Sequence, residues 1–181
     1  MAGHTNPILL DIPNHFETER LLIRIPRPGD GQVMNDDIRD SHEHLKQWMP
    51  WAQTVQPIEE SETLLRKAIA QFILREQFWL LLFRKSDGYL VGSSGLHNID
   101  WSVPSFEIGY WVRADCEGQG YITEAVNGIT LFTFDVLQAE RIEIRCDSRN
   151  DRSAAVARRA GYTLDGHFRH HAWATDATLR D

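Results

Sequence analysis

The chain has 181 residues, of which 42 % are hydrophobic and 25 % charged, and its formal net charge is −7 at pH 7. This length and composition are typical of one globular domain. We therefore predict a single domain over residues 1–181, with residues 1–15 as a flexible N-terminus. The acidic balance argues against general nucleic-acid binding, because neutralising phosphates requires a surplus of Lys and Arg. It is compatible with a cationic partner such as an amine.

Several absences favour a cytoplasmic protein. The two cysteines, Cys116 and Cys146, are far apart and match neither a disulfide framework nor a zinc site. The first residues lack the basic and apolar segments of a signal peptide. The longest apolar run, residues 78–83, is too short to cross a bilayer. We therefore predict no metal and no membrane partner.

The first half of the chain alternates strand and helix signals. Residues 20–25 are rich in β-formers and are closed by two prolines, so they predict a strand. Asp30 can cap a helix over residues 31–48. A second helix starts at Pro57, where acidic residues lie near the positive end of the helix dipole.

A three-stranded meander follows. The continuous apolar run at residues 78–83 predicts a strand that is buried on both faces. A turn at residues 85–88 leads into a strand over residues 89–96, and a further turn leads into a strand over residues 106–113.

A glycine-rich turn then leads into the most clearly amphipathic helix. Its inward positions are predicted to be Ile122, Ala125, Val126, Ile129, Phe132, Thr133 and Val136. Residues 141–146 alternate as in a strand, residues 151–160 form a short helix that ends at Gly161, and residues 162–168 predict a last strand. Hairpin-linked strands followed by crossover helices indicate an α/β fold with a mixed sheet and helices on both faces.

The glycine-rich turn is the most informative motif. Gly118 and Gly120 precede the amphipathic helix, and bare backbone N–H groups at a helix N-terminus can cradle a phosphate or pyrophosphate. A plain strand-to-helix turn has the same pattern, so both interpretations stay open at this point. A P-loop is excluded because no Lys-Ser or Lys-Thr follows, and a dinucleotide fingerprint is excluded because its third glycine is missing.

Residues 106–125 resemble the coenzyme A-binding motif of the GCN5-related N-acetyltransferases, and more narrowly of their RimJ/RimL branch. Matching segments follow in family order along nearly the whole chain: Glu17-Thr18-Glu19-Arg20-Leu21-Leu22-Ile23-Arg24, residues 45–51 with two tryptophans, Gly95-Leu96-His97, Glu107-Ile108-Gly109-Tyr110-Trp111, Gly120-Tyr121-Ile122-Thr123-Glu124-Ala125, Arg141-Ile142-Glu143-Ile144-Arg145-Cys146, Asn150-x-x-Ser153 and Gly161-Tyr162. The resemblance implies a mixed, mostly antiparallel twisted sheet with a splay between its fourth and fifth strands. It also implies transfer of an acetyl group from acetyl-coenzyme A to a primary amine.

The resemblance implies where the coenzyme binds. The splayed strands are residues 106–113 and 141–146, and the pantetheine arm is expected along the backbone of Trp111, Val112 and Arg113. The N–H of Val112 is the predicted donor to the oxyanion that forms during transfer. The diphosphate is expected on the main chain of Gly118, Gln119, Gly120, Tyr121, Ile122 and Thr123.

Two further positions concern the coenzyme. Asn150 is expected to contact the coenzyme arm, and it can also cap a helix. Glu117 departs from the family pattern, which has Gln or Arg there. Its carboxylate is expected to weaken coenzyme binding unless it points away from the diphosphate.

The resemblance also suggests proton-transfer groups. Many relatives use a tyrosine seven residues after the asparagine, which is Ala157 here, whereas the RimJ/RimL branch uses a serine at the position of Ser153. Ser153 is therefore the predicted acid or thiolate stabiliser, with helix capping as the alternative. Glu107 is the predicted general base, because burial among aromatic side chains is expected to raise its pKa; a salt bridge is its alternative role. His97, His170 and His171 are further candidates.

The acceptor is less well defined by the sequence. Trp48, Trp51 and His97 are predicted to line its cleft, although the tryptophans also fit a hydrophobic core. The branch suggests a protein N-terminal α-amine; an acyltransferase of a small-molecule amine (antibiotic, polyamine or amino-acid derivative) and a non-catalytic acyl-coenzyme A-binding module are the alternatives. Family members usually carry one more strand after residues 179–181. We therefore expect that this strand is lost, or that another subunit completes the sheet edge in a homodimer or higher homo-oligomer.

Overall fold

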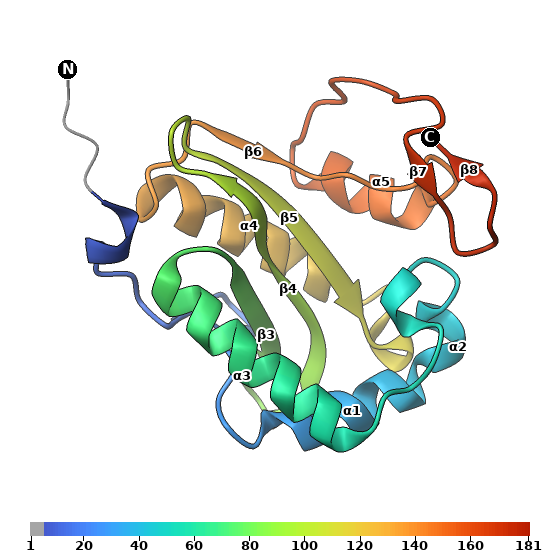
Figure 1. Cartoon of the computed structure of the whole chain (residues 1–181), viewed down its shortest axis with the longest axis horizontal. Coiled ribbons are helices and arrows are strands. Elements are labelled where there is room, and N and C mark those ends of the chain that lie inside the picture. Colours follow the sequence, from blue (N-terminus) through green and yellow to red (C-terminus); the bar gives the residue numbers. More distant parts are fainter. Residues whose placement is uncertain (1–5) are drawn as a thin grey trace.

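The computed structural model describes residues 6–181, and it contains one six-stranded sheet with helices on both faces (Figure 1). The part of the predicted flexible N-terminus that covers residues 1–5 lies outside the described residues. The sheet order is β1 (His15–Glu17), β2 (Leu21–Arg24), β3 (Phe78–Arg84), β4 (Leu90–Asp100), β5 (Ser105–Val112) and β6 (Arg141–Glu143). Neighbouring strands are antiparallel, except that β5 and β6 are parallel. The predicted mixed α/β sheet is confirmed.

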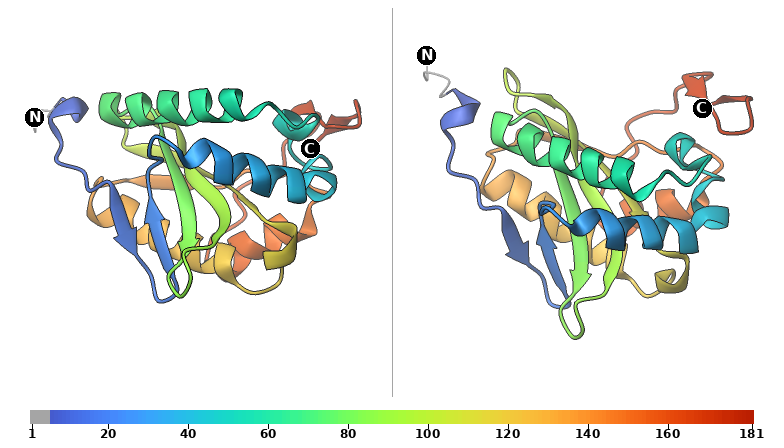
Figure 2. Two further views of the ribbon diagram at one scale, coloured as in Figure 1. Left: turned by 90° about the horizontal axis from the view of Figure 1, so that it is seen from below. Right: turned by 60° about the horizontal axis from the view of Figure 1, so that its bottom comes forward.

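The helices form two layers. Short 3₁₀ turns lie at η1 (Pro7–Leu9), η2 (Pro50–Ala52) and η3 (Ala114–Cys116), and the α-helices are α1 (Asp30–Asp40), α2 (His42–Leu45), α3 (Ile58–Leu74), α4 (Tyr121–Asp135) and α5 (Asp151–Arg159). Seen along the sheet, α1 and α3 cover one face and α4 and α5 the other (Figure 2). Within residues 6–181, no helix has the length and apolar character needed to span a bilayer.

The alternation of side chains along β5 distributes them between the two layers. Phe106 and Ile108 belong to the hydrophobic cluster beneath α4, whereas Trp111 packs with residues of α1 and α3. The amphipathic pattern of α4 is confirmed at six of the seven predicted inward positions, namely Ile122, Ala125, Val126, Ile129, Phe132 and Thr133. The seventh, Val136, is 38 % exposed and lies just after the last residue of α4.

The sheet splays where the resemblance predicts it. β5 pairs with β6 only from Ser105 to Glu107, opposite Arg141 to Glu143. The remainder of β5 has β4 as its only strand partner within the described residues. The amide of Arg113 donates to the carbonyl of Val91 at 3.0 Å. Because hydrogen-bonding direction alternates along an antiparallel strand, the amides of Tyr110 and Val112 face away from β4, into the gap.

The structure corrects three predicted elements. The helix predicted over residues 31–48 is interrupted at Ser41, whose hydroxyl accepts from the amide of Ala114 at 3.1 Å. The strand predicted over residues 141–146 ends at Glu143. The strand predicted over residues 162–168 is wrong: this segment has no regular structure, and its apolar side chains Leu164 and Phe168 remain exposed.

Two further pairings were not predicted. β1 is an edge strand of three residues, too short to give a pattern. β7 (Ala172–Trp173) and β8 (Leu179–Arg180) form a separate two-stranded sheet near α5. The helix over residues 151–160 is confirmed with small differences at its end, and Gly161 adopts the left-handed backbone that a helix C-terminus favours, with φ of 82°.

Candidate active site

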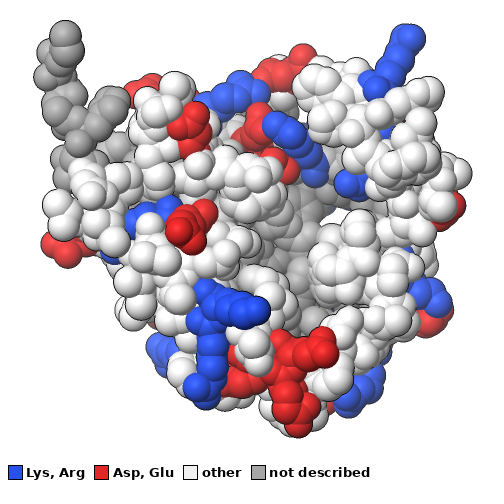
Figure 3. All heavy atoms as spheres, in the orientation of Figure 1, with Lys and Arg blue, Asp and Glu red and all other residues white. Residues whose placement is uncertain are grey.

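A cavity of about 1020 Å³ crosses the sheet where β5 separates from residues 144–150. On the face covered by α1 and α3 its lining includes Trp48, Trp51 and His97, and on the face of α5 it includes Asn150 and Ser153. Figure 3 shows the molecular surface hollowed near the middle of this view. The structure therefore brings the predicted acceptor-side and coenzyme-side residues into one continuous space.

The floor of the cavity on the acceptor side is formed by two glycines. Gly95 of β4 lies opposite Gly109 of β5 in the strand register. A Cβ on Gly95 would lie 2.3 Å from the carbonyl oxygen of Phe78, so the close strand packing requires glycine there. At Gly109 the ring of His97 takes the space that a Cβ would occupy, with Cε1 2.9 Å from that position.

Tryptophans form the walls around this floor. Trp48 and Trp51 line the cavity as predicted, and Trp51 is 46 % exposed. The ring of Trp51 is 6.2 Å from that of Trp111, in a tilted arrangement. Trp79 also lines the cavity, and its indole N–H donates to Ser93 Oγ at 2.7 Å, which fixes the ring. These tryptophans therefore form an aromatic wall on this side of the cavity.

His97 and Glu107 lie opposite each other on β4 and β5 and form a side-chain pair in the cavity. His97 Nε2 is 3.2 Å from Glu107 Oε1. Asn98 Nδ2 donates to Glu107 Oε2 at 2.8 Å, and Arg145 Nε lies 3.6 Å from the same oxygen. Three donors or cations from different segments therefore converge on one carboxylate.

This environment contradicts the predicted raised pKa of Glu107. Burial alone raises that pKa, but the hydrogen bonds from His97 and Asn98 and the charge of Arg145 outweigh it and hold the pKa below its usual value. The prediction considered only the aromatic neighbours in sequence, of which Phe106 and Tyr110 belong to the opposite face of β5. Glu107 is therefore an ionised carboxylate near neutral pH.

The coenzyme side is organised around Ser153 in the first turn of α5. The side chain of Asn150 accepts from the amide of Ser153 at 3.0 Å, so its predicted capping role is confirmed. Tyr110 of β5 reaches across the gap, and its hydroxyl lies 3.0 Å from both Ser153 Oγ and the Ser153 carbonyl oxygen. Burial raises the pKa of Tyr110 to about 12, so this phenol stays protonated.

The turn before α4 has the geometry of an anion cradle. Gly118 and Gly120 have φ of 70° and 81°, a conformation that side chains other than glycine rarely adopt. Gly120 is the N-cap of α4, and no side chain caps this helix. The first amides of α4 are therefore free to bind an anion at the positive end of the helix dipole. The residues present thus fit the diphosphate of coenzyme A.

The carboxylate of Glu117, which precedes this cradle, forms an ion pair with Arg152 and also lies near His44. Its Oε1 is 2.6 Å from Arg152 Nη1 and 3.5 Å from His44 Nε2. The pairing reduces the repulsion that the carboxylate would otherwise exert on a phosphate.

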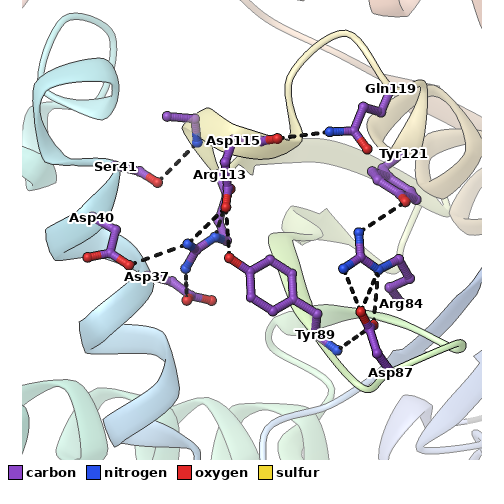
Figure 4. A network of polar contacts seen from close by, with 11 residues as sticks. Asp37, Asp40, Ser41, Arg84, Asp87, Tyr89, Arg113, Asp115, Gln119 and Tyr121 are labelled. Carbon is purple, nitrogen blue, oxygen red and sulfur yellow. Dashed lines mark hydrogen bonds and ion pairs between the residues drawn. The ribbon is translucent and has the colours of Figure 1, made fainter.

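Two polar networks fix the cradle and the end of β5. Glu124 in the first turn of α4 accepts from Thr18 Oγ1 at 2.6 Å and from the backbone amide of Arg20 at 2.7 Å, which ties the turn between β1 and β2 to this helix. Arg113 follows β5 and pairs with Asp37, Asp40 and Asp115, while its guanidinium lies 4.7 Å from the centre of the Tyr89 ring (Figure 4).

Sequence reasoning missed several residues of the cavity. Tyr110, Trp79, Asn98 and Arg145 occupy positions that become informative only once the strand register is known, because each acts on a residue of another segment. Conversely, His170 and His171 do not line the cavity; the backbone of His170 binds Asp181 and the ring of His171 packs against Phe168.

The splayed sheet and the bare helix N-terminus are the features that the sequence resemblance predicts for an acyl-coenzyme A-dependent N-acyltransferase. Residues 20–163 match the family model described as the acetyltransferase (GNAT) domain. The chain therefore belongs to the GNAT acetyltransferase family. It is an N-acetyltransferase that uses acetyl-coenzyme A to acetylate an amine.

Individual relatives agree with this assignment. The chain is 30 % identical over 157 residues to YdaF of Bacillus subtilis (strain 168), which is provisionally named a ribosomal N-acetyltransferase, with 83 % of this chain and 82 % of that protein covered. It is 27 % identical over 137 residues to the ribosomal-protein-serine acetyltransferase of Escherichia coli (strain K12), covering 74 % and 73 % of the two chains. The fold matches RimL, a ribosomal L7/L12 α-N-protein acetyltransferase in complex with coenzyme A, with a TM-score of 0.84 and 21 % identity over 93 % of each chain.

Proposed function

We propose that this single-domain N-acetyltransferase modifies the α-amine of a protein N-terminus. The observation that carries the proposal is the cavity that crosses the sheet, because it gives a donor and an acceptor separate approaches to the open edge of β5. Its volume of about 1020 Å³ has to hold both the coenzyme arm and the acceptor, and on the acceptor side it is bordered by the 46 % exposed Trp51. The names of all three relatives given above refer to the ribosome or to ribosomal proteins, which supports a protein acceptor.

On the coenzyme side, different residues would bind the different parts of acetyl-coenzyme A. The free amides from Gly118 to Thr123 would hold the diphosphate. The unpaired edge of β5 around Trp111, Val112 and Arg113 would hold the pantetheine arm, and Asn150 retains its amide N–H₂ for the same arm while its oxygen caps α5. When bound, acetyl-coenzyme A supplies an acetyl group activated as a thioester.

Two groups beside the gap between β5 and residues 144–150 can stabilise the charges that develop on oxygen and sulfur during acetyl transfer. The amide of Val112 faces the gap and can donate to the oxygen of the reacting carbonyl. Ser153 can donate its hydroxyl proton to the departing sulfur, and Tyr110, whose hydroxyl donates to the Ser153 carbonyl oxygen and contacts Ser153 Oγ, holds the serine in place. Ala157 has no hydroxyl, and Tyr110 is a phenol that contacts Ser153 from β5.

The test is acetylation of matched acceptors followed by mass spectrometry. One peptide has a free N-terminus and no lysine, a second has the same sequence with a blocked N-terminus and one lysine, and a third set contains polyamines and aminoglycosides. Acetylation of the first peptide is the expected result. Exclusive modification of the small amines would contradict the proposed acceptor while leaving the N-acetyltransferase activity intact.

A further inference from the structure

Acetylation of an amine requires removal of a proton from nitrogen. The nitrogen lone pair forms the bond to the acetyl carbon, the carbon–sulfur bond breaks with its electron pair going to sulfur, one proton leaves nitrogen, and one proton is added to sulfur. Ser153 serves the sulfur in the proposed function. The nitrogen comes from the opposite face of the sheet, so its proton acceptor must lie on the acceptor side of the cavity.

His97 is placed for this task. Its imidazole lies over the bare α-carbon of Gly109, because a Cβ built on that glycine would be 2.9 Å from His97 Cε1 and 3.5 Å from Nδ1. The side chain of His97 is 35 % exposed and lines the cavity. The ring therefore rests on the same glycine floor that a substrate would approach.

Glu107 determines which nitrogen of the ring is available. A carboxylate accepts hydrogen bonds and donates none, so the 3.2 Å contact between Glu107 Oε1 and His97 Nε2 places the proton on Nε2. The neutral ring then presents Nδ1 as its basic atom. Asn98 and Arg145 hold the carboxylate from the other side. This is the arrangement of a base oriented by a third group.

We propose that Nδ1 of His97 accepts the proton of the attacking amine and that Glu107 is the positioning residue that orients His97 and stabilises its cationic form. The proposal rests on the amine-acetylating function stated above and replaces the sequence-based assignment of Glu107 as the base. Other charged or titratable side chains that line the cavity are Glu60 and Lys67 of α3, Tyr110 of β5, Arg145, Cys146, Asp147 and Arg180. Of these, Arg145 contacts the pair through Glu107.

The first experiment compares His97→Ala with wild type, using the free-N-terminus peptide as acceptor. The expected result is a fall in kcat of about 10²–10⁴-fold with an unchanged Kd for coenzyme A. Added imidazole is expected to restore part of the rate, since the missing ring leaves space in an open cavity. His15→Ala is the matched control, because His15 is an exposed histidine of β1 at the opposite edge of the sheet. His97→Gln serves the same purpose if the alanine variant does not fold.

The second experiment measures kcat/KM against pH for wild type and Glu107→Gln. Loss of the carboxylate charge destabilises an imidazolium at position 97, so the acidic limb is expected to move to lower pH. Deprotonation of the free acceptor is the same for both proteins and cannot produce this shift. Imidazole is expected to give no rescue of Glu107→Gln, whose ring is still present.

The outcomes separate this inference from the proposed function. A wild-type enzyme that leaves the peptide unmodified contradicts the proposed acceptor, and the same variants are then measured with the small amine that is modified. Wild-type rates in both His97 variants would overturn the inference. The inference would also be overturned if Glu107→Gln lost activity while the pH dependence of its remaining activity was unshifted. Glu107 would then act as the base itself.

Discussion

Tyr110 and Ser153 meet across the gap in the sheet, with 3.0 Å between their hydroxyl oxygens. One belongs to β5 and the other to α5, so the contact joins the two walls between which the pantetheine arm would lie. A phenol whose pKa is raised to about 12 remains a hydrogen-bond donor throughout the physiological range. Ser153 therefore keeps a protonated neighbour at all relevant pH values.

Substitution of this pair is expected to lower kcat to different extents. Ser153→Ala removes the proposed donor to sulfur and is expected to reduce kcat by about 10²–10⁴-fold. Tyr110→Phe removes one neutral hydrogen bond, worth about 1 kcal/mol, and is expected to reduce it about fivefold. Steady-state kinetics with saturating acetyl-coenzyme A measure both, and Ser153→Thr is the control that keeps a hydroxyl. Equal losses in the two main variants would contradict this division of roles.

Asn150 has two roles that substitutions can separate. Asn150→Ala removes the cap of α5 and is expected to lower the free energy of unfolding by about 1 kcal/mol and to weaken coenzyme A binding. Asn150→Asp keeps an oxygen that caps the helix but loses the amide N–H₂, so only coenzyme binding is expected to weaken. Chemical denaturation and calorimetric titration give the two quantities. Unchanged affinity in the aspartate variant would leave Asn150 with its capping role alone.

The effect of Glu117 on the diphosphate is expected to be small and salt-dependent. Glu117→Gln removes a negative charge near the cradle and frees Arg152, so coenzyme A is expected to bind about 1.5- to 5-fold more tightly, equivalent to ~0.2–1 kcal/mol. The difference is expected to shrink as salt is raised, because exposed charges are screened. Titrations at low and high salt, with Glu76→Gln as a remote control, measure it. Weaker binding by the glutamine variant would show that Glu117 assists the site through Arg152.

The acidic cluster around Arg113 predicts a pH-dependent stability. Burial raises the pKa of Asp37 to about 7 despite the charge of Arg113, whereas the hydrogen bond from Arg113 lowers the pKa of the more exposed Asp115 to about 2. Three carboxylates share one guanidinium, and Asp37 is the most buried of them. Because the folded protein binds a proton on Asp37 more tightly than the unfolded chain does, the stabilisation is complete below about pH 4 and is lost as the pH rises through about 7.

Asp37→Asn is expected to remove that contribution. The free energy of unfolding of the wild type, relative to that of the variant, is expected to fall between about pH 4 and about pH 7 by at most about 1.4 kcal/mol per pH unit. Urea denaturation at several pH values measures the difference between the two proteins. A difference that rises with pH over this range would mean that Arg113 keeps Asp37 ionised.

Much of the fold was predictable because its signals are local. The apolar run of β3, the turn at Gly88 and the periodicity of α4 from Ile122 onward each depend on a few neighbouring residues. The interruption of the first helix was not predictable in this way. It occurs at Ser41, whose hydroxyl accepts from the amide of Ala114, a residue more than seventy positions away. The predicted strand over residues 162–168 was wrong. Its apolar residues Leu164 and Phe168 stay exposed, so their presence in the sequence did not mark the buried face of a strand.

The candidate site likewise has a part that could be predicted from local sequence and a part that could not. The backbone elements of the coenzyme side, Gly118 and Gly120 before α4, follow from residue type and order. The electrostatics do not, because the sign of the pKa shift of Glu107 depends on His97, Asn98 and Arg145, which the strand register and the splay bring together. The contact of Tyr110 with Ser153 could not be predicted for the same reason, because Ser153 is 43 positions further along the chain.

The cavity that crosses the sheet has a kinetic consequence. With separate approaches for thioester and amine, neither substrate must depart before the other arrives, so double-reciprocal plots of initial rate should intersect rather than run parallel. A covalent acetyl-cysteine is not needed, and although Cys146 is exposed as a residue, partial desolvation of its thiol raises its pKa and lowers the thiolate fraction. The open strand edge thus favours direct transfer within a ternary complex.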